Sequence, residues 1–372
     1  MQITDRAAAR TFDALGTLLL ADLDPHSHHP FAKHWFDREL AYVFGLDEIR
    51  FRDFLEQAHA QRVLRRTLEV LTENLDGSEP AHIPERMSRV LSQERKRART
   101  ASAFLRAIVS EFTRLGHPIM VMKTLDHWPD TGSDLDLLVA APEQTVWHVM
   151  ESRFDAQRQT QSWGDRLANK WNFSVPGLSE LVEVHVGCLG QTGEQRALAN
   201  RLLSRRVDET FDDRSFPVPM PEDRIVIATL QRMYRHFYIR FTDILNLTVL
   251  VRAGRLDFTR LRESTERWAI WPGVATLLKI TSDYNARAGD GPLSLPDFVM
   301  SSARFGAEKT YVGKQFLRVP MLPQGSQLFL QQLIGTGTAR RFRSAARLSL
   351  LPALAVAAFV NLKFTGDDKG IW

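Results

Sequence analysis

The stretch TGSDLDLLV, residues 131–139, places two aspartates inside an otherwise apolar run that has the composition of a buried β-strand. Aspartate is depleted in strands, and a carboxylate that faces a core without a partner is costly. Side chains alternate between the two faces of a strand, so Asp134 and Asp136 would share one face, with their Cβ atoms about 7 Å apart. The other face would be formed by Leu135, Leu137 and Val139. The pattern therefore predicts a strand with one apolar face and one acidic face.

A second stretch, LVEVHVG at residues 181–187, repeats this alternation. Glu183 and His185 would share one face, and the opposite face would be formed by Val182, Val184 and Val186. If the two strands are neighbours in one sheet, three carboxylates come together, and such a cluster requires positive counter-charge. Carboxylate oxygens are the ligands that Mg²⁺ and Mn²⁺ prefer. We expect His185 to support the ligands rather than to bind the metal itself.

These stretches resemble a known family. GSDLDLLV resembles the metal-binding strand of the polymerase-β-type nucleotidyltransferase superfamily, in which an Asp-apolar-Asp-apolar strand follows a helix, a strand and a loop. VEVHVG resembles the acid-x-His form of the strand that carries the third acid in a poorly characterised bacterial branch. A lysine often ends the preceding strand in that branch, and VMK supplies Lys123 here. The helix QRMYRHFYIRFTDILNL, residues 231–247, is similar to its helical segment, so the resemblance covers about residues 96–250.

The resemblance implies an α+β fold, in which a small mixed sheet with helices forms the nucleotidyltransferase core. It implies an enzyme that moves a nucleoside monophosphate, most simply AMP from ATP, to a hydroxyl acceptor and releases pyrophosphate. Asp134 and Asp136 would bind both metal ions, Mg²⁺ or Mn²⁺. Glu183 would complete the metal on the acceptor side and assist deprotonation of the acceptor. A small molecule, a peptide or a protein side chain is favoured as the acceptor over nucleic acid.

The end of the first strand departs from the superfamily pattern. Where Gly-Ser or Gly-Gly is usual, this chain has Lys123 and Thr124, and Gly132-Ser133 is displaced to just before the acids. Lys123 would offer the phosphates a point charge and Thr124 a hydroxyl. The expected nucleotide contacts are therefore Lys123, Thr124, Gly132 and Ser133. The same departure favours an alternative of another class, a catalytically silent nucleotide-binding or scaffolding member of the same fold.

Composition and length indicate the class of protein and the number of domains. The 372 residues are 44% hydrophobic and 25% charged with a net charge of +4, which is typical of a globular protein of two or three domains. Cys188 is the single cysteine, so no internal disulfide can form and a cytoplasmic location is expected. The first 24 residues include acidic side chains and only a short apolar run, which does not fit a signal peptide.

The pattern along the chain predicts four regions. Residues 1–95 read as helical, residues 96–190 as the α/β core, residues 191–335 as a helical C-terminal domain, and residues 336–372 as a basic and apolar terminal helix with a tail. Within the core, we expect a helix that stops at Gly116 and Pro118, strands at residues 119–122 and 134–140, a helix from Pro142, and a strand pair joined through Pro176-Gly177.

Four other features have less specific readings. The run Leu348 to Leu362 spans 15 residues with Pro352 inside, which is short of the roughly 20 that cross a bilayer. We therefore expect a buried terminal helix, with a contact to an anionic membrane surface as the alternative. The basic run ERKRAR, residues 94–99, is expected to be the solvated start of a helix rather than a nucleic-acid contact. HSHHP, residues 26–30, is expected to be a polar loop rather than a zinc site, and Arg240 with Asp243 a structural pair rather than a substrate contact.

Overall fold

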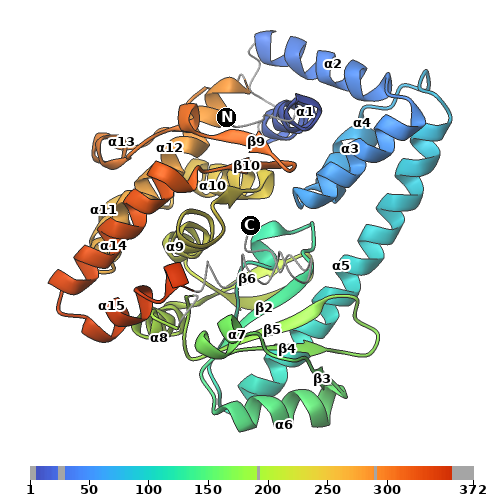
Figure 1. Cartoon of the computed structure of the whole chain (residues 1–372). Coiled ribbons are helices and arrows are strands. Elements are labelled where there is room, and N and C mark those ends of the chain that lie inside the picture. The colour runs from blue at the N-terminus through green and yellow to red at the C-terminus, as the bar shows by residue number, and fades with distance from the viewer. Residues whose placement is uncertain (1–5, 24–29, 191–192, 289–290, 354–372) are drawn as a thin grey trace. The chain divides into compact units, whose positions relative to one another are not determined.

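Figure 1 traces the chain of the computed structural model, which describes residues 6–23, 30–190, 193–288 and 291–353. The chain forms two compact units, each built from three segments of sequence. We call the first the helical unit, which is formed by Met1–Ala98, Phe237–Leu256 and Pro272–Gly325. We call the second the sheet unit, which is formed by Arg99–His236, Asp257–Trp271 and Ser326–Trp372. The predicted boundary at residues 95 and 96 falls inside a continuous helix, α5 (His82–Arg114).

The sheet unit is organised around a five-stranded sheet with the order β1-β2-β5-β4-β3. Strands β2 (Asp134–Val139) and β5 (Leu181–Val186) are parallel neighbours, and the other pairs are antiparallel. The remaining strands are β1 (Ile119–Val121), β4 (Lys170–Ser174) and β3 (Gln157–Arg158). The two predicted acidic strands are thus adjacent, and the predicted pair through Pro176-Gly177 is β4 with β5. The expected α+β class with a small mixed sheet is confirmed.

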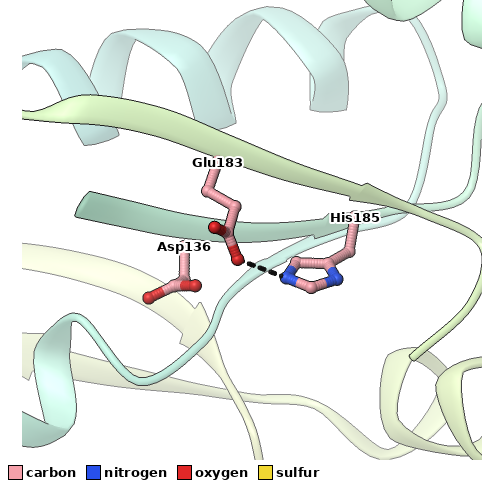
Figure 2. A group of neighbouring side chains, drawn as sticks. All are labelled: Asp136, Glu183 and His185. Carbon is pink, nitrogen blue, oxygen red and sulfur yellow. Dashed lines mark hydrogen bonds and ion pairs between the residues drawn. The ribbon is translucent and has the colours of Figure 1, made fainter. Parts of the chain in front are cut away.

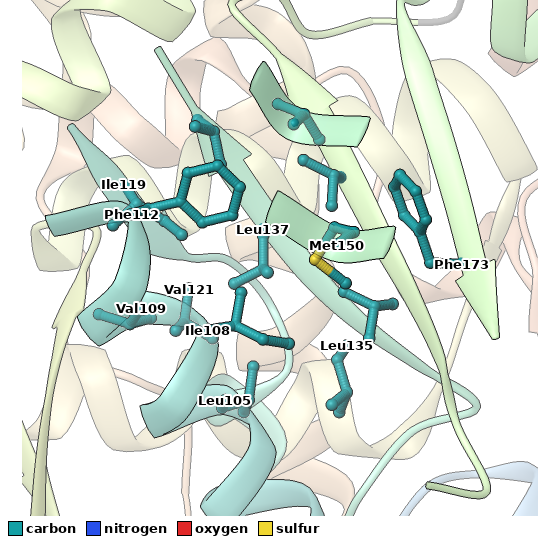
Figure 3. Close-up of a cluster of buried hydrophobic side chains, with 14 of the residues drawn as sticks. Leu105, Ile108, Val109, Phe112, Ile119, Val121, Leu135, Leu137, Met150 and Phe173 are labelled. Carbon is teal, nitrogen blue, oxygen red and sulfur yellow. The ribbon is translucent and has the colours of Figure 1, made fainter. Parts of the chain in front are cut away.

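Two helices pack on the apolar face of this sheet (Figure 3). Side chains of α5 and α6 (Glu143–Phe154) meet the fully buried Leu135 and Leu137 of β2, and the contributing helix residues are Leu105, Ile108, Val109, Phe112, Val146, Val149 and Met150. Each such side chain stabilises the fold by about 1.5–3 kcal/mol relative to exposure. A slip of one residue in β2 would turn the aspartates into this core, so the core fixes which face carries the acids.

Helix ends in the sheet unit follow the predicted signals. α5 ends at Arg114, ahead of Gly116, which has a φ of +78°. Pro142 is the residue that precedes α6, with an extended backbone. The other elements of this unit are η1 (Leu125–His127), α7 (Trp163–Leu167), α8 (Arg196–Arg205), β6 (Val207–Phe211), β7 (Arg214–Val218), α9 (Pro221–Gln231), the π-helical turn η2 (Arg232–His236), α11 (Phe258–Glu266), α14 (Ser326–Thr338) and α15 (Phe342–Leu348). The hairpin β6-β7 lies in a region expected to be helical.

The helical unit contains most of the predicted N-terminal helices. They are α1 (Arg6–Asp22), α2 (Pro30–Phe44), α3 (Glu48–Ala60) and α4 (Leu64–Glu73), together with the later α10 (Phe241–Arg252), α12 (Trp271–Arg287) and α13 (Asp297–Ser302). The segment between α3 and α4 turns at Arg62, whose φ is +55°. The buried Gln61 fixes this turn, because its side-chain oxygen accepts the Phe241 N–H over 2.7 Å and its amide donates to the Gln315 carbonyl.

A small three-stranded sheet in the helical unit corrects two sequence expectations. Its order is β8-β10-β9, with β8 at Tyr238–Ile239, β9 at Tyr311–Gly313 and β10 at Phe316–Arg318. The predicted helical domain at residues 191–335 is therefore not wholly helical, and its strands were missed because two or three residues are too short to show a periodicity. The expected helix over residues 231–247 is interrupted at Phe237, whose φ is +52°, and resumes as α10.

Most of the remaining predictions fall on described residues. Arg240 precedes α10, and its backbone N–H donates to Asp243 over 2.8 Å, which is a structural contact. In α5, Arg95 pairs with Glu69 and Arg97 with Glu94. Leu348 is buried at the end of α15, whereas residues 354–362 of the predicted terminal helix lie outside the described residues. His26, His28 and His29 also lie outside them.

The described residues include no helix that combines the length and the hydropathy needed to cross a bilayer.

Candidate active site

The register between β2 and β5 brings two acids side by side. Asp136 is paired with Glu183, and Leu138 is paired with His185. Paired residues of neighbouring strands lie about 4.8 Å apart and point to the same face. The carboxyl groups of Asp136 and Glu183 therefore meet on the sheet face opposite the α5–α6 core, with the His185 ring beside them (Figure 2).

Asp136, Glu183 and His185 form one buried group. Each offers a ligand atom, and these atoms all lie within 4.8 Å of one another. The exposed fractions of the three residues are 5%, 9% and 4%, so water screens them little. Asp134 lies outside this group, half-buried at the outer end of β2, where it accepts the Ser133 hydroxyl over 3.0 Å. The structure thus gathers His185 with two of the three predicted acids.

Two lysines balance the charge of the two buried acids. Lys123 Nζ lies 2.5 Å from Asp136 Oδ1. Lys170 Nζ lies 2.8 Å from Glu183 Oε2 and 2.9 Å from Asp165 Oδ1. Buried carboxylates persist in the charged form only when such partners are present. The cluster is therefore a network of four ionisable groups, which are Asp136, Lys123, Glu183 and Lys170.

The pKa of Glu183 is held low within this network. Burial alone would raise it, but the hydrogen bond from His185 and the charges of Lys123 and Lys170 outweigh burial and hold the pKa of Glu183 well below its usual range. Burial also lowers the pKa of His185, so the ring is neutral at pH 7. Because Glu183 is ionised, His185 Nε2–H donates to Glu183 Oε1 over 2.8 Å, and Nδ1 is left as an acceptor. A carboxyl of such low pKa is a weak base, which favours the ligand role of Glu183 over the proton-accepting role.

Asp136 differs from Glu183 in its protonation. Burial raises the pKa of Asp136 to about 7, although Lys123 opposes the rise, and the neighbouring Glu183 and Asp134 carboxylates add to it. The Lys123 ammonium group lowers the pKa of Asp136 by less than burial and the neighbouring carboxylates of Glu183 and Asp134 together raise it. A second positive charge at this position would therefore be strongly favourable, because it would allow Asp136 to ionise fully.

The Lys123-Thr124 turn shapes the acid strand directly. Lys123 has a φ of +49°, a left-handed conformation that glycine adopts most easily, and glycine is what the superfamily has at this place. The Thr124 hydroxyl oxygen accepts the backbone N–H of Asp136 over 2.8 Å, so it positions the strand. Gly132 is buried and Ser133 is exposed at the outer end of the strand. Of the four residues expected at the phosphates, Lys123 and Thr124 contact Asp136, and Ser133 contacts Asp134.

Sequence reasoning missed Lys170 and Arg235, which belong to the same neighbourhood. Lys170 is paired with His185 across β4 and β5, and its pKa is raised, because Glu183 and Asp165 outweigh the opposing effects of burial and of the Arg235 charge. The available signal was the alternation of NKWNFSV, which places Lys170 and Asn172 on one face. The register that brings Lys170 to Glu183 is a tertiary feature.

Comparison with known proteins shows the family of the chain. Residues 47–284, more than half of the chain, match the family described as "Uncharacterised nucleotidyltransferase". The chain belongs to this nucleotidyltransferase family. The matched range includes both acid strands, Lys123 and Lys170, together with parts of both units.

Two further comparisons give no information about the function of the chain. A nucleotidyltransferase-like antigenic protein from Paracoccidioides brasiliensis is similar in structure, with a TM-score of 0.36 and 14% sequence identity, over 55% of this chain and 98% of that one. That likeness is too distant to support a statement about function. A search of curated proteins finds no significant match.

The donor set of the cluster fits a divalent metal ion of this nucleotidyltransferase. Two carboxylates and one imidazole offer oxygen and nitrogen ligands within a few ångströms of one another, a set that Mg²⁺ accepts through its oxygens and Mn²⁺ through both kinds of atom. His185 Nδ1 lies on the side of the ring away from the two carboxylates, so the oxygen atoms of Asp136 and Glu183 are the main ligands on offer (Figure 2). The raised pKa of Asp136 is a sign that positive charge is needed there.

Proposed function

We propose that this nucleotidyltransferase transfers a nucleoside monophosphate, most simply AMP from ATP, to a hydroxyl acceptor in the presence of Mg²⁺ or Mn²⁺. The observation that carries the proposal is the pairing of Asp136 with Glu183 on parallel strands, with a lysine beside each acid. Two adjacent carboxylates can share a metal ion, and the flanking lysines match the charge of phosphates. Cys188, the single cysteine, is buried and unpaired by any disulfide, which suits the cytoplasm as the site of this activity.

Each residue has a role in this proposal. Asp136 and Glu183 would hold the metal ion, and Asp134, at the outer end of β2, would join them when the nucleotide is bound. Mg²⁺ or Mn²⁺, when bound, would neutralise the triphosphate and polarise the bond to the leaving pyrophosphate. Lys123 would move its charge from Asp136 to the phosphates. Lys170 would keep the Glu183 carboxylate in place, since it contacts Oε2 while His185 contacts Oε1.

The reaction balances as an in-line displacement at phosphorus. The acceptor hydroxyl oxygen forms a bond to the α-phosphorus, and the bond between the α-phosphorus and the bridging oxygen breaks. Pyrophosphate leaves with the bonding electrons, and the hydroxyl proton passes to a carboxylate of the cluster. Thr124 keeps the β2 backbone at the position that this geometry requires.

Labelled nucleotides test the proposal. The purified chain is incubated with Mn²⁺, a pool of small hydroxyl compounds and peptides, and ATP labelled at the α-phosphate or, in parallel, at the γ-phosphate. We expect the α-label alone to appear on an acceptor or on the protein, and Asp136→Asn to abolish the transfer. Transfer of the γ-label alone would contradict the proposal, because it would indicate a kinase reaction.

A specific observation favours a second candidate, a silent nucleotide-binding member of the family. Both buried acids already have lysine partners, and the Thr124 hydroxyl is already bonded to the strand. In that case the chain would bind ATP without transferring either label. The same incubation, combined with a measurement of ATP binding, separates the two candidates.

A further inference from the structure

A pocket within the sheet unit adjoins the acid cluster. Lys123 and His185 line one end of it. The rest is lined by residues of α9, η2, α14 and the end of α15, by Leu351, and by the segment after β5, which includes Glu194. Its empty volume is about 660 Å³ when the open solvent at its mouth is included. Its apolar wall is formed by Met122, Leu189, Ile227, Leu230, Leu348 and Leu351.

Two buried polar residues line the same pocket. His185 Nδ1 is buried and has no hydrogen-bond partner among the described residues. Gln332 is only 2% exposed and lines the pocket as well. Native proteins leave few buried polar atoms unbonded, so the Nδ1 atom points to a ligand that bonds it.

Arg235 gives the pocket its charge preference. No described carboxylate lies within ion-pair distance of its guanidinium, whereas Lys123 and Lys170 each have an acid partner. Arg235 is close enough to Lys170 for the two positive charges to oppose each other. A guanidinium in this position suits a carboxylate or a phosphate, which it can bind through two parallel hydrogen bonds.

The pocket shares Lys123 with the place expected for a triphosphate, but the rest of its lining lies farther from the exposed end of the acid face. The exposed end of the acid face is at Ser133 and Asp134. The pocket begins two residues beyond Glu183, at His185, and continues past the end of β5 to Leu189. A triphosphate with its metal ion would enter from the exposed end, which leaves the inner, mainly apolar pocket for the other substrate.

We propose that this pocket holds the acceptor, and that the acceptor is a compact hydroxyl compound with one anionic group, a carboxylate or a phosphate, on an apolar body. That the ligand is an acceptor rests on the proposed transfer reaction, whereas the expected chemistry of the ligand follows from the residues that line the pocket. The anionic group pairs with Arg235, polar atoms of the ligand bond Gln332 and His185, and the hydroxyl faces Asp136 and Glu183.

Binding without metal or nucleotide tests the ligand class. Calorimetry of the full chain with phenyllactate, its neutral methyl ester and glycerol phosphate compares a carboxylate, an uncharged match and a phosphate. We expect phenyllactate or glycerol phosphate to bind about tenfold or more tightly than the ester, because a charged pair of this kind is worth more than about 1.4 kcal/mol. Which of the two binds better identifies the anionic group. Equal binding of acid and ester, or no binding of either anion, would overturn the proposal.

Variants locate the ligand in this pocket. Arg235→Gln should abolish the preference for the anion, and Gln332→Met should weaken binding several-fold, because it removes a polar group that lines the pocket. Arg262→Gln is the matched control, since that arginine is exposed and pairs with Glu266 in the same unit. It should bind like the natural chain. An unchanged preference in Arg235→Gln would overturn the assignment.

A parallel measurement separates this inference from the proposed function. Arg235→Gln should bind ATP with Mn²⁺ as the natural chain does. If ATP binding falls by the same factor as anion binding, the pocket belongs to the nucleotide and the inference is wrong. If the anions bind as expected but neither label is transferred, the pocket stands as a ligand site and the transfer reaction fails.

Discussion

Lys123 Nζ lies 2.5 Å from Asp136 Oδ1, so the acid that pairs with Glu183 across the strands already has a cation beside it. A divalent ion at Asp136 must displace that ammonium group or share the carboxylate with it. The lysine would then be released toward the phosphates of the nucleotide. Lys123 therefore links two events, entry of the metal ion and binding of the triphosphate.

Lys123→Ala should affect the two ligands in opposite directions. Without nucleotide, the variant should bind Mn²⁺ more tightly, because no ammonium competes for Asp136. It should bind ATP more weakly, by about tenfold or about 1.4 kcal/mol, because a charge on the phosphates is lost. Calorimetry with each ligand measures both changes.

Lys314→Ala is a matched control for the backbone. Lys314 is exposed, lies in the helical unit and has a φ of +48°, close to the +49° of Lys123. Both substitutions leave a non-glycine residue in the same left-handed conformation, so any shared loss of stability cancels. Unchanged ATP affinity in Lys123→Ala would show that the lysine does not replace the usual glycine turn.

Thr124→Val should destabilise the fold, whereas Thr124→Ser should not. The valine side chain fills the same space but leaves the buried Asp136 N–H without its acceptor, which the hydroxyl now provides at 2.8 Å. An unsatisfied buried donor costs about 1–3 kcal/mol. Urea denaturation of the two variants measures the difference. Equal stability of the valine and serine variants would mean that the hydroxyl has no positioning role and is free for phosphate.

The stability of the chain should depend on pH through Asp136. Its pKa is about 7 in the folded chain and 3.8 when unperturbed, so the folded state retains a proton that the unfolded state has lost. This contribution lowers the free energy of unfolding as pH rises from about 4 to about 7, by on the order of a few kcal/mol in total. Asp136→Asn cannot ionise, so it should gain stability relative to the natural chain over this window.

Denaturation at about pH 5 and about pH 8 measures that gain, because the difference between the two proteins isolates Asp136. His185 has a lowered pKa and contributes in the opposite direction, but it does so in both proteins. Glu183 has a pKa well below 4.5, so its favourable contribution is complete in this window and is lost only at lower pH. A pH-independent difference would indicate that Asp136 is already ionised at pH 5.

The acid strands could be predicted because alternation and burial act on short segments. An Asp-Leu-Asp-Leu run has one face that must be buried, and the same holds for Val182, Glu183 and Val184, so both acidic faces were determined locally. Their adjacency followed from the family resemblance and is confirmed by the parallel pairing of Asp136 with Glu183.

The partners of the acids could not be predicted in the same way. Lys170 reaches Glu183 through the register of β4, and Gln332 reaches the pocket from a helix almost 150 residues later in the chain. Such contacts depend on how distant segments pack, which periodicity does not report. The two-residue and three-residue strands β8, β9 and β10 were missed because they are too short for a pattern. The sequence pattern also did not show that each unit is built from three separate segments, because this too depends on how distant segments pack.

Binding of Mn²⁺ in the presence of an ATP analogue with a non-hydrolysable α–β bridge tests the metal–nucleotide site most directly. The variant Asp136→Asn with Glu183→Gln should lose at least about tenfold in Mn²⁺ affinity, because both buried carboxylate ligands become amides. Asp155→Asn is the control, since it removes an exposed acid at the end of α6 whose left-handed backbone asparagine tolerates. We predict tight binding by the natural chain and by Asp155→Asn, and its loss in the double variant. Binding of equal strength in all three proteins would contradict the assignment of Asp136 and Glu183 as the metal site.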